Sequence, residues 1–146
     1  MRLTSFTDFG LRALMRAAAA PEDVLTTEAI AAELQISRHH LTKVVRELAA
    51  AGIVKTSRGA GGGFTLARPP AQISLGEVVR LLEARHALVE CFRADGGVCV
   101  LVPRCRLKGH LARAEEAFLA ELDRVSLAEC AIGPLATPRA VPETVG

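Results

Sequence analysis

The feature that most constrains the fold is an ordered set of local signals over residues 26–70: a short helix, a tight turn, a longer helix and a hairpin. Thr26 or Thr27 and Ser37 are the expected helix caps, and together with apolar residues at helical spacing they predict helices over 28–34 and 38–51, the second ending at Gly52. Two short apolar runs then flank a glycine-rich tip that carries Arg58, which is typical of a β-hairpin. The helix pair and the hairpin together predict a winged helix-turn-helix, and either one alone would be a much weaker signal.

Further helices are expected on both sides of this unit. One spans about residues 5–20, and another begins at the capping-box sequence Ser74–Glu77. A long helix over 106–124 carries a narrow apolar seam, formed by Leu107, Leu111, Ala114, Phe118, Leu122 and Val125. Such a seam on a long terminal helix favours pairing with a second copy. We therefore expect a mainly α fold with a small β-hairpin: a winged helix-turn-helix with a long C-terminal dimerisation helix.

Composition narrows the function classes. No stretch free of Asp, Glu, Lys and Arg exceeds nine residues, which is too short to span a bilayer. Asp8, Arg12 and Arg16 interrupt the apolar residues near the N-terminus, unlike a signal peptide. We therefore expect a cytoplasmic protein, where disulfides are rare and clustered thiols more often bind metal. We find no paired acids, nucleophile elbow or nucleotide loop, so we do not expect an enzyme.

Positive charge is concentrated in the predicted winged helix. Residues 37–68 hold six basic residues and one acid, a net charge of +5, whereas the rest of the chain sums to −3. A locally basic segment on an otherwise acidic protein indicates a polyanion at one face, here double-stranded DNA. The side chains expected to contact DNA are Ser37, Arg38, His39, His40, Lys43, Arg46, Lys55 and Arg58. The first five begin the recognition helix, where side chains reach base edges in the major groove.

The remaining three residues of this set have different expected roles. Arg46 and Lys55 suit phosphate contacts, which add affinity without sequence information. Arg58 is flanked by glycines at the wing and suits a narrow, A·T-rich minor groove. Taken alone, either histidine of the His39–His40 pair would be interpreted as part of a solvent-exposed helix start, and the glycine tip could be a plain tight turn.

Three cysteines are clustered between the winged helix and the long helix. Cys91, Cys99 and Cys105 have the spacing C-x7-C-x5-C. Three soft thiolates in one short loop suit an iron–sulfur cluster, zinc or copper(I), and they leave a four-coordinate site one ligand short. Cys130 lies far along the chain near the tail, and we interpret it as a small buried or frayed residue.

Three segments carry a family resemblance: the opening run 1–14, the wing 58–66 and the run 103–108 around the third cysteine. They resemble the NsrR-type repressors of the Rrf-type winged-helix regulators, over roughly residues 1–130. The resemblance implies a homodimer in which each cysteine loop holds an iron–sulfur cluster, usually [4Fe–4S]. It also implies the ligands, which are Cys91, Cys99, Cys105 and Asp8 from the partner subunit. Asp8 alone would read as an acid favoured in the first turn of a helix.

Relatives of the IscR type offer a second possibility for the cofactor. They hold [2Fe–2S] with three cysteines and a histidine close after the third. His110 lies five residues beyond Cys105, further than that pattern places it, which favours the NsrR type. The seven-residue gap between Cys91 and Cys99 is longer than expected of the IscR type. The number of irons in the cluster therefore stays open, with [2Fe–2S] as the alternative to [4Fe–4S].

The resemblance and the residues together give an expected function. The dimer would repress transcription at a pseudo-palindromic, A·T-rich operator and release it when nitric oxide nitrosylates the cluster. Two alternatives stay open: an iron–sulfur or redox-status regulator of the IscR type, and a cluster-free, metabolite-responsive regulator with a pocket between its domains. The expected organisation is a DNA-binding domain over 1–70, the cysteine loop and dimerisation helix over 71–132, and a disordered tail over 133–146.

Overall fold

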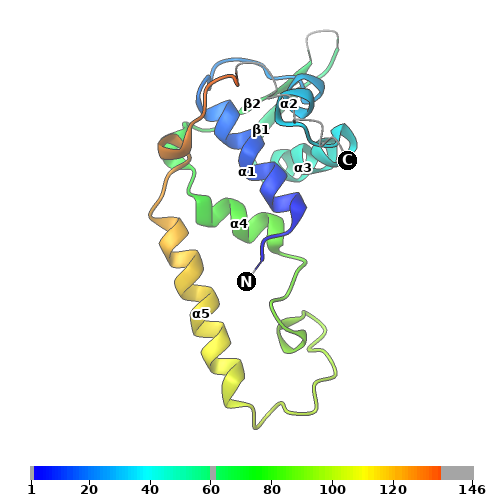
Figure 1. Ribbon diagram of the computed structural model, residues 1–146, viewed down its shortest axis with the longest axis vertical. Coiled ribbons are helices and arrows are strands. Elements are labelled where there is room, and N and C mark those ends of the chain that lie inside the picture. Colours follow the sequence, from blue (N-terminus) through cyan, green and yellow to red (C-terminus); the bar gives the residue numbers. More distant parts are fainter. Residues whose placement is uncertain (1, 60–61, 136–146) are drawn as a thin grey trace, which may run out of the picture.

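The computed structural model of the protein describes residues 2–59 and 62–135. Its elements follow the expected order and confirm a mainly α fold with one small hairpin (Figure 1). They are α1 (Ser5–Ala18), α2 (Thr27–Leu34), α3 (Arg38–Ala50), β1 (Val54–Ser57), β2 (Gly63–Leu66), α4 (Leu75–Glu83) and α5 (Arg106–Asp123), with the 3-10 turns η1 (Pro70–Gln72), η2 (Glu90–Phe92) and η3 (Leu127–Cys130). Of the expected tail, only the part up to Leu135 belongs to the described residues.

The helices begin at the predicted polar caps. The side-chain oxygens of Thr26, Ser37 and Ser74 accept hydrogen bonds from the backbone of α2, α3 and α4, respectively. The reciprocal half of the predicted capping box is wrong, because the Glu77 carboxylate pairs with Arg68 Nη2 at 2.5 Å instead. Arg68 follows the hairpin, so this pair joins the wing to α4 rather than closing α4 on itself.

The hairpin has the predicted antiparallel form. Val54 lies opposite Leu66, and Ser57 lies opposite Gly63. The chain just before α2 adds to this sheet, because Leu25 and Phe64 exchange backbone hydrogen bonds of 2.9 Å in both directions. Phe64 is 1% exposed, so the base of the wing is anchored in the core while Arg58 remains at the surface.

Helix α1 lies at the centre of the fold, between α3 and α4. A Cβ atom at Gly10 would lie 3.1 Å from Val44 Cγ1 and 2.5 Å from Leu82 Cδ1, so the helices approach closely only because this residue lacks a side chain. The surrounding core is aliphatic, with Leu14, Leu41 and Val44 fully buried. Close packing of this kind leaves little freedom for α1 to move alone.

The chain returns to this core after α5. Leu127 of η3 is fully buried in the same cluster as the residues of α1, and its N–H donates to Ile73 O at 2.8 Å. Further on, Ile132 N–H donates to Met15 O of α1 at 2.9 Å. One hydrophobic core therefore includes residues from both sides of position 70, where the sequence predicts a domain boundary.

Helix α5 and the segment before it extend away from the winged helix (Figure 1). None of the described residues of α5 is buried, and Leu107 at its start is 60% exposed. Within residues 2–59 and 62–135, no helix is long and apolar enough to cross a membrane. The predicted apolar seam is thus present on a helix whose side chains are largely uncovered in the single chain.

The close approach at Gly10 leads to a stability prediction. We expect Gly10→Ala to lower the free energy of unfolding by about 1–3 kcal/mol, because the added methyl group overpacks α1 against buried Val44 and Leu82. Gly109→Ala in α5 is the matched control, since its Cβ would meet only Arg113 Nη1 at 3.6 Å. That change should stabilise the protein by about 0.5–1 kcal/mol through helix propensity. Chemical denaturation measures both, and equal effects would contradict the packing argument.

Candidate nucleic-acid interface and metal centre

The predicted DNA-reading side chains form one exposed set on α3 and the wing. The structure places each of them at the surface: Ser37, Arg38, His39, His40, Lys43, Arg46, Lys55 and Arg58. The opposite face of α3 is buried, with Leu41, Val44 and Leu48 fully covered. Because α3 is amphipathic, burying this face directs the polar face outward.

The first turn of α3 is well supported. Ser37 Oγ accepts from His40 N–H at 3.4 Å, and Thr42 Oγ1 donates to Arg38 O at 2.8 Å. The Arg38 guanidinium lies 4.0 Å from Glu28, but both side chains are mostly exposed. Such a pair contributes little, so Arg38 is free to exchange it for a phosphate or a base.

One contact at this surface was not predicted from the sequence. The ring of Phe9 on α1 stacks on His40, with 6.3 Å between ring centroids and 24° between ring planes. The ring centroid of His39 lies 6.0 Å from that of His40, in a tilted arrangement. Nothing in the local sequence signals the Phe9–His40 contact, because the two residues lie on different helices.

The three clustered cysteines lie along the segment between α4 and α5. Cys91 belongs to η2, Cys99 lies in the following loop, and Cys105 is the N-cap of α5 with no capping bond from its side chain. These three and Cys130 are free thiols of intermediate burial. None of these thiol groups is therefore part of a disulfide.

Tight turns shape the tip of this loop. Asp95 Oδ1 accepts from Gly97 N–H at 3.0 Å, and Glu90 Oε1 accepts from Val98 N–H at 3.1 Å. Gly96 and Gly97 have φ angles of 78° and 59°, a region in which glycine carries no steric penalty. Hydrogen bonds within the loop and the left-handed glycines thus shape the tip between Cys91 and Cys99.

The described single chain does not assemble a metal site by itself. Among its described residues, no group of three or more His, Cys, Asp or Glu side chains is placed to hold a metal ion. Asp8 lies on α1, where both carboxylate oxygens contact Arg12, at 2.7 and 3.2 Å. His110 lies inside α5, with Nδ1 2.8 Å from Arg113 Nη2. The structure therefore does not bring Asp8 or His110 together with the cysteines.

Large apolar side chains near Cys99 are uncovered. Val98, Val100 and Leu101 are 85%, 92% and 65% exposed, respectively. Contiguous exposed apolar residues of this kind are typical of surfaces that another molecule covers.

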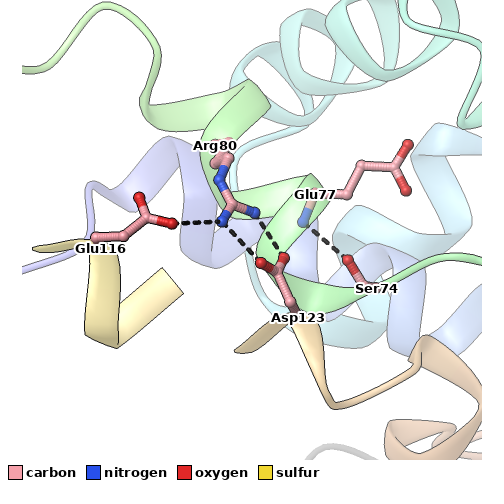
Figure 2. A network of polar contacts seen from close by, with 5 residues as sticks. All are labelled: Ser74, Glu77, Arg80, Glu116 and Asp123. Carbon is pink, nitrogen blue, oxygen red and sulfur yellow. Dashed lines mark hydrogen bonds and ion pairs between the residues drawn. The ribbon is translucent and has the colours of Figure 1, made fainter. Parts of the chain in front are cut away.

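An ion-pair network holds α5 against α4 (Figure 2). The Arg80 guanidinium donates two hydrogen bonds to the Asp123 carboxylate, at 2.6 and 2.7 Å, and lies 3.9 Å from Glu116. These hydrogen bonds hold the pKa of Asp123 below its usual range and raise that of Arg80. Gly76 permits the approach, because a Cβ there would overlap Asp123 and lie 2.9 Å from Leu119 O. The direction of α5 thus depends on a bidentate surface pair.

A second polar joint connects the end of α4 to the start of α1. Glu83 Oε1 accepts from Thr4 N–H at 2.8 Å and from Thr4 Oγ1 at 2.9 Å. Burial raises the pKa of Glu83, but hydrogen bonds from Thr7 and Thr4 outweigh it, and the pKa is lowered overall. The chain enters the cysteine segment directly after Glu83, so this joint ties that segment to α1.

A groove of about 630 Å³ lies between α4, the cysteine segment and α5. Val79, Phe92 and Leu119 supply apolar lining. Its three arginines, Arg80, Arg85 and Arg93, are paired with Asp123, Glu47 and Asp95, respectively. These arginines therefore already have carboxylate partners and are not free to bind an anionic metabolite.

Comparison with known proteins identifies similar chains. Residues 3–131 match the profile of the Rrf2 family, described as "Iron-dependent Transcriptional regulator". The chain is 48% identical over 130 residues to the HTH-type transcriptional regulator NsrR of Geobacillus kaustophilus, covering 88% of each protein. It is 42% identical over 128 residues to the NsrR of Shouchella clausii, covering 87% of this chain and 86% of the relative.

Solved structures show the same architecture. CymR, the global cysteine regulator of B. subtilis, superposes with a TM-score of 0.69 at 28% identity, over 90% of this chain and 96% of that one. T. potens IscR superposes with a TM-score of 0.68 at 25% identity, over 88% of this chain and 85% of that one.

The exposed reading surface predicts a salt-dependent interaction with DNA. We expect Lys55→Gln on the wing strand β1 to weaken binding and to reduce the slope of log K against log salt by about 1, since one phosphate-directed cation is lost. Arg113→Gln on α5 removes the same charge from a helix that extends away from the reading surface and should leave the slope unchanged. Fluorescence anisotropy over a salt series measures both, and equal losses would argue against a wing contact.

The Glu83 joint predicts a dependence of stability on pH. Because its pKa is lowered in the folded state, Glu83 contributes stability that is present above its unfolded pKa and lost as pH falls through the folded pKa. We expect Glu83→Gln to cost about 1 kcal/mol at pH 7 and to lose less stability than the original protein between pH 6 and 3. Thermal unfolding of both proteins between pH 6 and 3 measures how stability depends on pH. Parallel curves of stability against pH would refute the role of Glu83. Glu22→Gln serves as an exposed control.

Proposed function

The chain belongs to the Rrf2 family of transcriptional regulators, and we propose that it is a DNA-binding repressor that senses nitric oxide through an iron–sulfur cluster. The similar proteins are transcriptional regulators, and the protein is a regulator rather than an enzyme. The observation that carries the proposal is the placement of three free cysteines on the segment that leaves α4, the helix tied to α1 by Glu83. The DNA-reading unit and the helix that leads into the cysteine segment thus share one core.

The DNA partner would be read by α3 and the wing. In a winged helix-turn-helix, the start of the recognition helix lies in the major groove and the wing reaches the neighbouring minor groove. Arg38 and Lys43 would contact bases or phosphates, and Arg58 would enter an A·T-rich minor groove. A dimer of such units would require a pseudo-palindromic operator, because protein symmetry is mirrored in the two half-sites.

The dimer would form through α5. Its apolar seam has no buried residue within the single chain, and the neighbouring Val98, Val100 and Leu101 are also exposed. Pairing α5 with the α5 of a second copy would cover this surface and remove apolar area from water. The Arg80–Asp123 pair would then set the angle at which each reading unit projects from the dimer.

The residues of the loop fit an iron–sulfur cluster. Cys91, Cys99 and Cys105 are free and partly exposed, and soft thiolates are the ligands that iron–sulfur clusters prefer. The fourth ligand would be Asp8 of the partner subunit; in the described chain the Asp8 side chain is 45% exposed and pairs with Arg12 at the surface. We propose [4Fe–4S] as the cofactor, with [2Fe–2S] as the alternative.

The proposed sensing depends on residues that join the loop to the reading unit. When bound, the cluster would supply iron that reacts with nitric oxide and gives up protein ligands. Asp8 lies in the first turn of α1, and α1 packs directly on α3 at Gly10. Release of Asp8 would remove a restraint on α1 and thus on the spacing of the two recognition helices. A coupling of about 3 kcal/mol would weaken operator binding roughly 150-fold.

Anaerobic purification followed by a nitric oxide titration tests this function. Absorbance and native mass spectrometry should show a dimer with one four-iron cluster per subunit, which loses the cluster and operator binding together. A two-iron cluster that is indifferent to nitric oxide would move the assignment to an iron–sulfur or redox-status regulator. Colourless protein made with iron and sulfide available would favour a cluster-free, metabolite-responsive regulator.

Two cysteine variants form a matched pair for the ligand assignment. Cys99→Ser should abolish or destabilise the cluster, because a hard hydroxyl replaces a thiolate ligand. Cys130→Ser makes the same chemical change on η3 and should leave iron content unchanged. Iron and sulfide analysis of both proteins decides the matter, and equal iron loss would show that the loop cysteines are not specifically the ligands.

A further inference from the structure

We propose that the Phe9–His40 stack transmits the position of α1 to the recognition helix, so that His40 is a positioning residue and His39 is the histidine that contacts DNA. This inference rests on the proposed function, because it assigns roles within the same DNA-reading site. Both histidines lie exposed in the first turn of α3, but only His40 stacks on the ring of Phe9.

The contact belongs to a larger interface between the two helices. Phe9 and Gly10 are adjacent on α1, and they meet His40 and Val44, which lie one helical turn apart on α3. The close approach at Gly10 prevents α1 from sliding freely over Val44. Phe9 extends this interface to the first turn of α3, which in the proposed function enters the major groove of DNA. A shift of α1 would therefore displace the first turn of α3.

Helix α1 is also connected to the cysteine segment. Asp8, the proposed ligand from the partner subunit, directly precedes Phe9 in the sequence. Thr4, the N-cap of α1, donates to Glu83 at the point where the chain leaves α4 for the cysteines. Asp8 lies in the first turn of α1 and Thr4 is its N-cap, so both connections reach the start of the helix. The Phe9 ring therefore lies between the sensing residues and the reading residues.

The stack also limits what His40 can do at the operator. The imidazole lies in an offset stack with Phe9, with 6.3 Å between ring centroids, which holds it close to α1. Within residues 2–59 and 62–135, the one ring that His39 meets is that of His40, so His39 can turn toward a base edge or a phosphate. An aromatic pair of this kind corresponds to roughly a three- to tenfold effect on affinity if it is needed in the bound form.

Substitutions at the two histidines separate positioning from reading. The probe is a duplex selected from random sequence by the anaerobic dimer, and affinity is measured by fluorescence anisotropy. We expect His40→Gln to lose roughly three- to tenfold in affinity and His40→Phe to restore most of it, because phenylalanine keeps the ring but no hydrogen-bonding group. His39→Phe should lose affinity as His39→Gln does. Equal losses for His40→Phe and His40→Gln would overturn the inference.

A double-mutant cycle tests the partner ring. Phe9→Leu should weaken operator binding as much as His40→Gln, and the double variant should lose no more than either single one. Phe9→Leu combined with His39→Gln should instead be additive. Additivity of the Phe9 and His40 changes would mean that the stack carries no coupling.

Nitric oxide distinguishes failure of the inference from failure of the proposed function. In the original protein, the affinity for the duplex should be much higher before nitric oxide is added than after. In Phe9→Leu the ratio of these two affinities should be smaller, while the iron content stays the same. An unchanged ratio in Phe9→Leu would overturn the inference alone. If the original protein shows no change with nitric oxide, the proposed sensing fails, and the histidine comparison still decides the positioning role. Failure to select any duplex would overturn both.

Discussion

The structure depends on the packing of α1 between α3 and α4, which is possible because Gly10 has no side chain. Val44 of the recognition helix and Leu82 of α4 both approach this point, and both are almost fully buried. The reading unit and the helix that leads into the cysteine segment are therefore joined through α1. Since close-packed interiors transmit displacement rather than absorb it, a change at either end of α1 reaches the other.

Hydrogen bonds and ion pairs, by contrast, orient the cysteine segment and α5 relative to this core. Glu83 fixes the end of α4 to the cap of α1, and the Arg80–Asp123 pair fixes the end of α5 to α4. Exposed ion pairs add little stability, but a bidentate pair constrains direction. The loop and α5 leave apolar side chains uncovered, which is consistent with a surface completed by a second subunit.

Much of the fold could be predicted because its signals are local. Thr26, Ser37 and Ser74 cap the helices as expected, since a cap needs only its own first turn. Gly52 follows α3 with a φ of 74°, the left-handed geometry that ends a helix. The exposure of the reading residues could also be predicted, because the apolar face of α3 must be buried. The metal ligands remain a prediction, since the single chain does not gather them.

The sequence by itself determined the order of elements, the polar and apolar faces of the helices and the presence of three thiols in one loop. These follow from chemistry within a few neighbouring residues. Only the tertiary structure decided that Glu77 pairs with Arg68, that Glu83 holds Thr4 and that Phe9 stacks on His40. Each of these contacts joins different elements, and its partner depends on how the backbone brings distant segments together, which no local pattern specifies.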